Sequence, residues 1–567
     1  MSPHILFLLG IAGFAAWLIP NHYPPWVSFH AEVLICLAAL VALSGELVRR
    51  GARWLISPLA GFAILLACAP LVQFAGGLIH FAGDAWMATA FLLCLSLTLV
   101  LGQALADRLS QQPLLDGLSI LTVAAGIANV GLQLYQWLSL TGLGIFAVEL
   151  APKHSPYANV AQPNHLASML FLSMVGLIHL YQRARVGPAT ATVALLFFMT
   201  GIAMSGSRTA WLTVAMLVLM LWWFRRTAGM RVGGWLLATM AVALPMLVLV
   251  WPLANDALLL SPGRTLAAQV EAGPRPLLWS AMADAVSRHP WFGYGWNQGL
   301  VALSTVAVDH PVNGRLIENS HNLLLDLFIW NGVPLGLLIA GALAYWFYRQ
   351  WRSIREPWQV LALSGVAGIF IHTMLEFPLS YAYFLIPVGL LMAMLDSVPS
   401  TRRGLRVPRP AIAALSLVAA ALGGAIVYEY VEVEASTRIL RWEVARIGTS
   451  KIESPAPELV ILTQWGAYLR YARLEPKAAA SPAELAWMRA VVERFPNRSA
   501  LLNYAITSGL SGQKGEAHRA LVELCAIHTP RACASDLREW KELVASSRPQ
   551  LADVELPTEA SLARPRR

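Results

Sequence analysis

Residues 318–341 of the chain read ENSHNLLLDLFIWNGVPLGLLIAG. The stretch after His321 is apolar and predicts a membrane-spanning helix, since a helical crossing of the bilayer takes about 20 mostly apolar residues. The start of this helix is polar, because Asn319, His321 and Asn322 are clustered there. A helix that only contacts lipid gains nothing from such side chains. Its role therefore depends on which side of the membrane this polar end faces, and on what else faces that side.

The whole chain has the composition of a polytopic membrane protein. It has 567 residues, of which 57% are hydrophobic and 13% are charged, and its mean hydropathy is +0.57. No cleavable signal peptide is evident, because the first apolar segment lacks a basic start and a small-residue cleavage site, so we expect it to stay as a span. We expect an all-α bundle of about thirteen spans, at 4–21, 25–45, 54–75, 84–106, 116–142, 165–182, 187–204, 209–224, 233–254, 321–347, 358–375, 382–397 and 409–430.

The formal net charge of +9 could suggest a nucleic-acid partner, but the placement of the basic residues indicates membrane topology instead. Arginines fall on every second connection between the expected spans, which is the positive-inside pattern. This pattern puts the N-terminus in the cytoplasm and everything after residue 430 outside, with some attraction to anionic lipid headgroups. The arginines concerned are Arg49, Arg50, Arg53, Arg108, Arg183, Arg185, Arg225, Arg226, Arg231, Arg349, Arg352, Arg355, Arg402, Arg403, Arg406 and Arg409.

The orientation divides the chain into two domains. Residues 1–430 form the transmembrane domain, with long outer loops at 143–164 and 255–320, and residues 431–567 form an outer helical domain with a disordered tail over about the last twenty residues. In the second loop we expect mostly non-helical chain with one short helix at 276–288. In the outer domain, SPAE at 481–484 predicts a helix start through a capping box. The stretch from Ala500 predicts a helical hairpin of tetratricopeptide kind.

The five cysteines suggest no zinc site. Cys36, Cys68 and Cys94 lie inside apolar spans, where we interpret them as packing residues. Cys525 and Cys533 lie in the outer domain, where an oxidising compartment favours a disulfide. A bridge between two helices and a pair of buried thiols both fit this spacing.

Basic residues that break the positive-inside rule are informative, because lysine and arginine are normally sparse on the outer side. Six such residues are Lys153, Arg208, Arg264, Arg275, Arg288 and Arg315. Polar residues from four separate segments reach the same outer boundary. These are Gln162, Asn164 and His165 at the start of span six, Arg208 before span eight, His321 before span ten, and His372 and Glu376 after span eleven. We therefore predict one shared site that faces outward.

Each of these residues also has a purely structural interpretation. His321 can be an interfacial residue at a helix start, Arg208 can reach lipid headgroups, and Glu376 can cap a turn. A polar stripe on span five, formed by Asn129, Gln133 and Gln136, fits contacts between helices better than a site. The hypothesis of a site rests on the residues lying together, not on any one of them.

The residue types at the outer boundary indicate a chemistry. Arginine binds phosphate oxygens through two parallel hydrogen bonds. A metal-dependent transferase would need paired acids, whereas Asp256, Glu271, Asp284, Asp309, Glu318 and Glu376 are scattered in the sequence. We therefore expect no metal or other cofactor, with arginines neutralising a departing diphosphate and a neutral histidine accepting a proton from a hydroxyl. Glycosyl transfer from a lipid diphosphate to a hydroxyl fits this set.

Several motifs resemble the O-antigen ligase and polymerase superfamily. They are AQPNHLA, SGSRTAW, RPLLWSAMADAVSRHPWFGYGWNQ, ENSHNLLLDLFIWNGVPLG and HTMLEFPLSYAYF, which cover about residues 150–400. The first and last look most like PglL-type bacterial protein O-oligosaccharyltransferases. The resemblance implies a metal-independent, GT-C-like enzyme of the bacterial inner membrane. Such an enzyme transfers glycan from undecaprenyl diphosphate to serine or threonine of periplasmic proteins, often pilins.

The resemblance also implies roles for individual residues. The family's essential histidine corresponds to His321, and its diphosphate-binding arginines correspond to Arg208 and Arg275, with a looser match at Arg264. Asn319 and Asn322 are expected to hold the imidazole ring or the acceptor. We expect supporting or acceptor contacts from Gln162, Asn164, His165, His372 and Glu376.

Other functions remain possible at this point. An O-antigen ligase that uses a lipid A-core sugar as acceptor, or a glycan polymerase, would use the same chemistry at His321. A lipid or solute transporter would instead place charged groups near the membrane midplane. A structural scaffold would leave the outer arginines unexplained. The outer domain could receive acceptor protein or could only stabilise the membrane domain.

Overall fold

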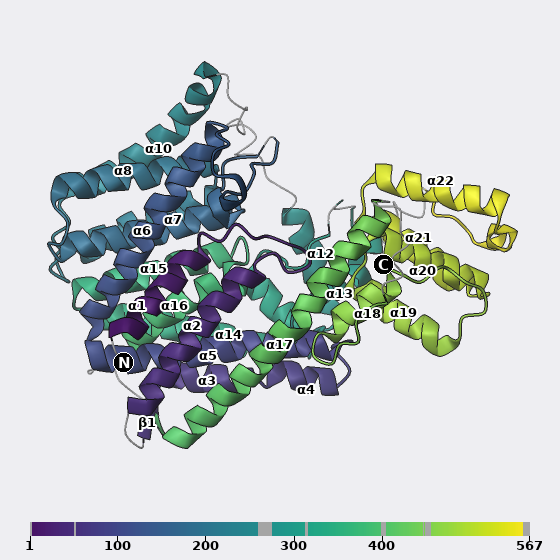
Figure 1. The fold of residues 1–567 in the computed structure, drawn as a ribbon, viewed down its shortest axis with the longest axis horizontal. Coiled ribbons are helices and arrows are strands. Elements are labelled where there is room, and N and C mark those ends of the chain that lie inside the picture. Colours follow the sequence, from purple (N-terminus) through teal and green to yellow (C-terminus); the bar gives the residue numbers. More distant parts are fainter. Residues whose placement is uncertain are drawn as a thin grey trace. The chain divides into compact units, whose positions relative to one another are not determined.

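The computed structural model describes residues 3–49, 53–152, 154–258, 275–311, 314, 316–398, 404–445, 447 and 455–558 (Figure 1). Three of the outer basic residues, Lys153, Arg264 and Arg315, lie outside these ranges. The chain forms two compact units. The first comprises Met1–Leu66, Phe91–Glu271 and Leu343–Ala421, and the second comprises Ala67–Ala90, Ala272–Ala342 and Leu422–Arg567.

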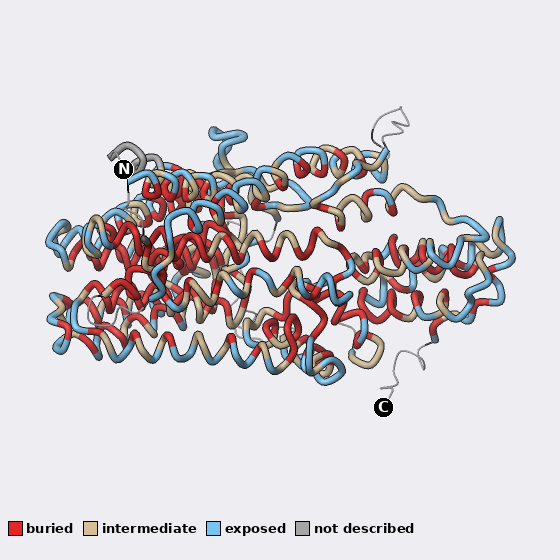
Figure 2. Tube along the Cα trace, turned by 90° about the horizontal axis from the view of Figure 1, so that it is seen from below, coloured by how far each residue is buried: buried red, intermediate tan, exposed pale blue. Residues whose placement is uncertain are grey.

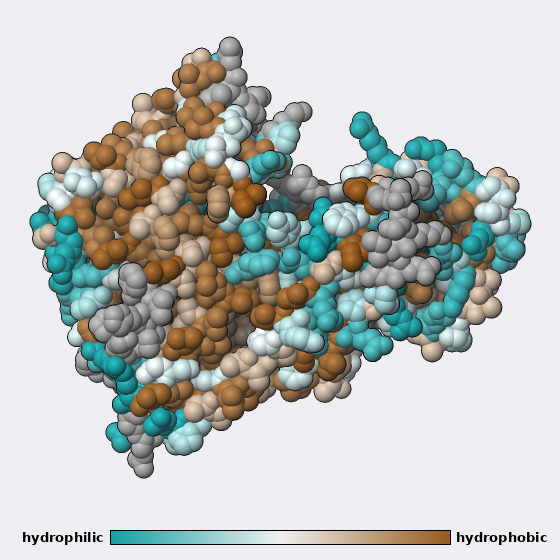
Figure 3. Space-filling view, in the orientation of Figure 1, coloured by the Kyte–Doolittle hydropathy of each residue, from teal (hydrophilic) through white to brown (hydrophobic). Residues whose placement is uncertain are grey.

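The first unit is a bundle of apolar helices. Buried residues, red in Figure 2, gather where these helices pack on one another, and exposed apolar side chains contribute the brown surface in Figure 3. Proline stands in the first turn of α7, α8 and α15, where the missing N–H is not needed. The helices are α1 (Pro3–Ala16), α2 (Phe29–Arg49), α3 (Pro58–Leu66), most of α5 (Ala82–Leu109), α6 (Gln111–Trp137), α7 (Pro163–Gln182), α8 (Pro188–Ser205), α9 (Arg208–Phe224), α10 (Gly234–Ala257), α15 (Pro357–Thr373), α16 (Ala382–Asp396), and parts of α14 (Leu323–Ser353) and α17 (Arg409–Val444).

Every expected span contains a helix, and the chain is a multi-pass helical membrane protein. Within the described ranges, nine helical stretches are long and apolar enough to cross a membrane. The other four expected spans correspond to shorter helices, namely α1, α9, α15 and α16 with 14, 17, 17 and 15 residues. The count of thirteen crossings stays a prediction.

The polar stripe on α6 makes contacts between segments, as its structural interpretation predicted. Asn129 Nδ2 donates to the Trp17 carbonyl oxygen at 3.3 Å. Gln133 Nε2 donates to the Gly201 carbonyl oxygen at 3.1 Å. Gln136 Nε2 donates to the Ala158 carbonyl oxygen at 3.1 Å. These amides thus join α6 to its neighbours inside the first unit and are not part of a separate site.

The basic connections assigned to the cytoplasm interact with one another. Strand β1 (Arg53–Ile56) pairs antiparallel with β2 (Leu405–Pro408), so the connections near residues 53 and 405 lie together. Ion pairs join further connections at this end: Arg108 to Glu46, Arg183 and Arg185 to Asp116, and Arg349 to Asp396. Contacts between alternate connections are what the topology requires, because those connections must share one side of the membrane.

The second unit combines segments from the middle of the chain with the C-terminal helices α18 to α22, called the outer helices below. Its elements are α4 (Ala69–Ala75), the start of α5, α12 (Arg275–Arg288), α13 (Gly299–Val306), η3 (Ala307–Asp309), the first part of α14, the end of α17, α18 (Thr463–Tyr471), α19 (Pro482–Arg494), α20 (Arg498–Leu510), α21 (Lys514–Ile527), α22 (Pro530–Ser546) and η5 (Pro549–Asp553). The short helix expected at 276–288 is present as α12. The helix α13 was not expected, so the prediction of a single helix in this loop is wrong.

The outer helices are held to the start of α5 by buried charge. Arg494 on α19 donates three hydrogen bonds to the Asp84 carboxylate, at 2.9–3.1 Å. Both side chains are almost fully buried. His80 Nε2 lies 3.0 Å from Glu493 Oε2, and the Gly83 N–H donates to Thr463 Oγ1 at 2.9 Å. Residues 80–84, which include the first turn of α5, therefore anchor α18 and α19.

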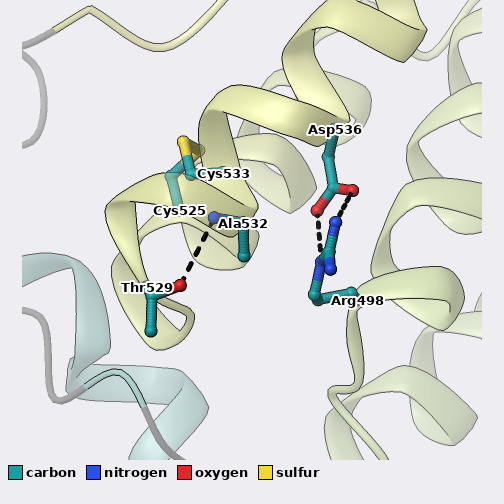
Figure 4. Close-up of a disulfide and its surroundings, with 6 residues drawn as sticks. All are labelled: Arg498, Cys525, Thr529, Ala532, Cys533 and Asp536. Carbon is teal, nitrogen blue, oxygen red and sulfur yellow. Dashed lines mark hydrogen bonds and ion pairs between the residues drawn. A yellow bond between two sulfur atoms is a disulfide. The ribbon is translucent and has the colours of Figure 1, made fainter.

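A disulfide joins α21 to α22 (Figure 4). It links Cys525 and Cys533, so the pair is a bridge and not two free thiols. Beside it, Arg498 on α20 forms a two-pronged ion pair with Asp536 on α22, at 2.5 and 2.9 Å. A disulfide in this part of the chain fits an oxidising compartment.

The ends of the outer helices partly match the sequence predictions. Ser481 Oγ accepts the Glu484 N–H at 3.2 Å at the start of α19, as the SPAE motif predicted. Helices α20 and α21 form the expected hairpin, and its assignment as a tetratricopeptide unit stays a prediction. Leu551 in η5 is fully buried, so disorder over the last twenty residues is wrong for the described part of that stretch.

Candidate functional site

His321 has an unusual backbone conformation at the start of α14. Its φ is +56°, in the left-handed region that residues with a side chain seldom adopt. Such conformations persist only where the surrounding structure holds them, and they are common at functional sites. The side chain is half-buried. His321 is therefore a fixed position in a tight turn and not one residue in a regular helix.

Both neighbours of His321 are fixed by hydrogen bonds. The Ser320 N–H donates to Asp326 Oδ1 at 2.8 Å. Asn322 Oδ1 accepts the N–H groups of Leu324 and Leu325 at 3.1 and 3.2 Å, which caps the first turn of α14. Asp326 is also close enough to His321 to interact with it electrostatically. The turn thus presents the imidazole from a backbone that is held on both sides.

Helix α12 is tied to the same turn. Trp279 Nε1 donates to the Ser320 carbonyl oxygen at 2.8 Å. Arg275, the first residue of α12, lies one turn before Trp279 on the same helix face, because residues four apart are neighbours. The structure therefore places Arg275 and His321 in the same region of the second unit.

Helix α13 contacts the polar stretch before His321. An added Cβ on Gly299, the first residue of α13, would lie 2.1 Å from the Glu318 carbonyl oxygen, so only glycine fits there. Asn319 follows in this stretch and is 8% exposed. The ENSH segment is thus held between α12 and α13. The GYGWNQG motif, which ends at Gly299, provides this close approach.

Two of the acids expected to be scattered are joined through Arg288. Its Nη2 lies 2.6 Å from Asp284 Oδ2 and 2.8 Å from Asp309 Oδ2. His310 Nε2 lies 3.0 Å from the same Asp284 oxygen. The hydrogen bond from Arg288 holds the pKa of Asp284 below its usual value, and the Asp284 carboxylate raises the pKa of Arg288. Asp284 and Asp309 are thus far apart in the sequence but contact the same guanidinium, and Arg288 neutralises them.

A second group of predicted residues lies together in the first unit. Gln162 Oε1 accepts the His165 N–H at 2.6 Å, which caps α7. Asn164 Nδ2 donates to Glu376 Oε1 at 3.0 Å. The Tyr381 ring lies 4.5 Å from the His165 ring. The loop before α7 and the turn after α15 therefore form one polar cluster.

His372 lies deeper in this cluster. It is fully buried, and its Nδ1 shares a hydrogen bond of 2.6 Å with Ser168 Oγ on α7. Its carbonyl oxygen accepts the Glu376 N–H at 2.8 Å, and Glu376 itself is 7% exposed. These contacts fix the turn that carries Glu376. Arg208, at the start of α9, belongs to the same unit.

The predicted site residues thus form two sets. Gln162, Asn164, His165, His372 and Glu376 are joined within the first unit, which also contains Arg208, and Arg275, Asn319, His321 and Asn322 lie within the second. Arg264 falls outside the described residues. A single site formed by both sets is a proposal. Sequence reasoning missed Trp279 and Asp326, whose importance comes from contacts with Ser320; only their positions in the matching motifs could have indicated them.

Comparison with known proteins supports the resemblance that the motifs indicated. A family model described as O-antigen ligase matches residues 191–340, and one described as the C-terminal part of a virulence factor membrane-bound polymerase matches residues 360–537. The chain is 27% identical over 551 residues to a general O-oligosaccharyltransferase of Acinetobacter baylyi, which covers 94% of both chains. The chain is thus similar to the O-antigen ligase superfamily over these segments. The resemblance to the PglL-type enzymes is confirmed, and the protein is a glycosyltransferase.

Two further relatives cover less of the chain. A ComP-specific O-oligosaccharyltransferase of the same organism is 24% identical over 412 residues, 69% of this chain and 70% of the relative. An O-antigen ligase of Pseudomonas aeruginosa is 31% identical over 96 residues, 16% of this chain and 20% of the relative. The two oligosaccharyltransferases thus match far more of the chain than the ligase does.

The described residues contain no candidate metal site. Among these residues, no group of three or more His, Cys, Asp or Glu side chains could hold a metal ion. The acids Asp284 and Asp309 both contact the guanidinium of Arg288. Catalysis without a metal stays a proposal.

Proposed function

We propose that the protein transfers glycan from an undecaprenyl-diphosphate-linked oligosaccharide to serine or threonine hydroxyls of periplasmic proteins such as pilins. The reaction takes place on the periplasmic side of the bacterial inner membrane and needs no metal. The observation that carries this proposal is the turn at His321. It holds a histidine in a left-handed conformation at the start of an apolar helix and is tied through Trp279 to the helix that begins with Arg275.

Arginines bind the donor in this proposal. Arg208 and Arg275 hold the diphosphate through charge-assisted, two-pronged hydrogen bonds, and Arg264 contributes a third positive charge. Their charge stabilises the diphosphate as it departs, which is where negative charge develops in the transition state. Helix starts suit this task, because Arg208 and Arg275 each begin a helix whose N-terminal end favours anions.

His321 acts as the general base. It accepts the hydroxyl proton while the acceptor oxygen attacks the anomeric carbon opposite the departing diphosphate, so the anomeric configuration is inverted. Asn322 uses its amide oxygen to cap α14, which leaves its Nδ2 group to contact the acceptor. Asn319 and the cluster of Gln162, Asn164, His165, His372 and Glu376 position the acceptor. Glu376 and His372 do so through the fixed turn that they share.

The acceptor in this proposal is a protein. Both oligosaccharyltransferase relatives support a protein acceptor, and one of them is named as specific for ComP. The outer helices could receive such a protein. Deleting them is a poor test, because it would leave the buried Asp84 carboxylate without Arg494. Charge reversal at the exposed residues Arg538 and Lys541 of α22 tests the same role without opening the core.

The deciding experiment is a transfer assay with the purified full chain, lipid-linked oligosaccharide and two acceptors in EDTA. One acceptor is a pilin-type protein, and the other is lipid A-core. Mass spectrometry should detect glycan on serine or threonine of the protein alone. Transfer only to lipid A-core would identify an O-antigen ligase instead. Activity that is lost in EDTA and restored by magnesium or manganese would contradict the metal-independent mechanism.

A further inference from the structure

Helix α14 has a kink whose depth in the membrane can be deduced. The backbone of Gly332 departs from helical geometry, with φ +71° and ψ 174°. At about 1.5 Å per residue, the helix covers about 26 Å from Gly332 to Arg349 and about 30 Å to Arg352. This length matches the hydrocarbon core of a bilayer, about 30 Å. If the arginines mark the inner boundary, as their charge indicates, Gly332 lies at the outer boundary.

A second span gives the same depth independently. Gln73 lies near the outer end of the candidate span Pro58–Ala75. Its Nε2 donates to the Trp330 carbonyl oxygen at 2.9 Å and to Asn331 Oδ1 at 3.2 Å. The end of one span is thus bonded directly to the residues that precede Gly332. Both helices place the kink at the outer membrane boundary.

The turn that follows α12 is fixed on this kink through backbone contacts. The Tyr294 N–H donates to the Ile329 carbonyl oxygen at 2.8 Å, and the Val333 N–H donates to the Pro290 carbonyl oxygen at 2.7 Å. An added Cβ on Gly332 would lie 2.4 Å from the Trp291 carbonyl carbon. The backbone of the 290–294 turn therefore lies against α14 at the depth of Gly332.

Two large side chains project from this fixed turn. Trp291 is 71% exposed and Phe292 is 73% exposed. Adjacent exposed aromatic rings on a rigid backbone are unfavourable in water, but they suit the headgroup region, where tryptophan is enriched and rings are half-solvated. Neighbouring exposed residues on α4 and α14, such as Val72 and Leu337, are apolar as well, at 69% and 57% exposure.

We propose that Trp291 and Phe292 insert into the outer leaflet of the membrane and anchor the periplasmic loop to the lipid surface. The partner is the lipid itself, at the boundary between headgroups and acyl chains. The anchor holds the end of α12, and with it the turn at Ser320 and His321 to which Trp279 is bonded, at the level of the headgroups. Insertion requires no assumption about the substrate.

The test is a nitroxide spin label in the full chain, reconstituted into vesicles of phosphatidylethanolamine and phosphatidylglycerol. The background variant replaces the free cysteines Cys36, Cys68 and Cys94 by serine and keeps the disulfide. Labels are placed at Phe292→Cys and, in a second variant, at Trp291→Cys. Leu337→Cys gives a reference for lipid, and Lys541→Cys on the exposed face of α22 gives a reference for water.

Collisions with oxygen, which concentrates in lipid, are compared with collisions with a water-soluble nickel complex. We expect the ratio of the two collision rates at residue 292 or 291 to approach that of the Leu337 label and to exceed that of the Lys541 label. A ratio equal to the Lys541 reference would overturn the proposal, since the pair would then lie in water. Low collision rates with both reagents would overturn it too, because protein would then cover the rings.

Discussion

The indole N–H of Trp279 donates to the carbonyl oxygen of Ser320 at 2.8 Å, and Ser320 directly precedes His321. This bond connects α12, which begins with Arg275, to the turn that carries the histidine. On the other side of the turn, Asp326 Oδ1 accepts the Ser320 N–H at 2.8 Å. Ser320 is fully buried, so water cannot replace either partner. The position of His321 therefore depends on two side chains that have no direct part in the proposed chemistry.

The first prediction concerns Trp279→Phe, which keeps an aromatic ring but removes the donor. A buried carbonyl that loses its partner costs about 1–3 kcal/mol, so the turn should loosen and kcat for glycan transfer should fall about tenfold. Donor binding should change little. Trp346→Phe is the matched control, because it removes an indole bond to Asp396 within the first unit. Equal losses of kcat in both variants would show a general loss of stability instead.

The fold was largely predictable because hydropathy and charge act along the sequence. Each expected span contains a helix, and the basic connections pair with one another. The missed elements depend on contacts between distant residues. Helix α13 has only eight residues, too few for a hydropathy pattern, and the kink at Gly332 exists because the turn at 290–294 packs against it.

The candidate site was predictable in composition but not in its connections. Order along the chain placed polar residues at outer helix ends, and Asn164 indeed meets Glu376 across more than two hundred residues of sequence. Nothing local in the sequence indicates that Trp279 bonds to Ser320 or that Arg288 joins Asp284 to Asp309. Such pairs arise from tertiary packing, which hydropathy and spacing do not report.

The second prediction concerns Arg208→Lys and Arg275→Lys. Lysine keeps the charge but loses the fork that binds two phosphate oxygens. Since a hydrogen bond to a charged group contributes about 1.5–3 kcal/mol, donor binding should weaken by about one to two orders of magnitude in each variant. Arg531→Lys, at an exposed position of α22, is the control. Titration of vesicle-bound enzyme with lipid-linked oligosaccharide measures the affinity, and unchanged affinity in both variants would rule out these residues as the diphosphate site.

The third prediction is a pH dependence of the α12 attachment. Arg288 lowers the pKa of Asp284 through a hydrogen bond, so the folded carboxyl group releases its proton more readily than the unfolded one. Such a group contributes stability above its unfolded pKa, about 4, and the contribution is lost as the pH falls through the lower folded value. Hydrogen exchange in residues 275–309 should therefore accelerate below about pH 4.

Two variants check the origin of this effect. Asp284→Asn should show faster exchange at neutral pH and a weaker response to acid. Asp553→Asn removes another carboxylate whose pKa is lowered, in this case by Lys514 on an exposed surface, and should leave α12 unchanged. A wild-type acid response in Asp284→Asn would assign the effect to other groups.

The fourth prediction concerns the disulfide. Reduction of Cys525–Cys533 frees the connection between α21 and α22, and native disulfides typically stabilise by about 2–4 kcal/mol. We expect proteolysis near Thr529 to accelerate at least tenfold in the reduced protein or in the Cys525→Ser, Cys533→Ser variant. Replacing the free thiols Cys36 and Cys94 by serine should leave this rate unchanged. Equal cleavage of oxidised and reduced protein would show that other contacts, such as the Arg498–Asp536 pair and the buried Trp540, suffice to hold α22.

The last prediction concerns His321→Ala. A positioned general base contributes about 10²–10⁴ to a rate, so single-turnover transfer should fall by about that factor while protein level and donor affinity stay nearly unchanged. Alanine should tolerate the left-handed backbone poorly, with φ +56°. A second variant, His321→Asn, is therefore needed. Asparagine adopts the left-handed conformation more readily than alanine, and its side chain cannot act as a base at neutral pH. His518→Ala, at a half-buried position of α21, controls for loss of a histidine elsewhere. If His321 only anchors the turn, His321→Asn should retain much of the transfer rate. If it only binds the diphosphate, both variants should lose donor affinity and saturating donor should restore the rate. Loss of single-turnover transfer in both variants at saturating donor, with unchanged affinity, is the result that only a general base produces.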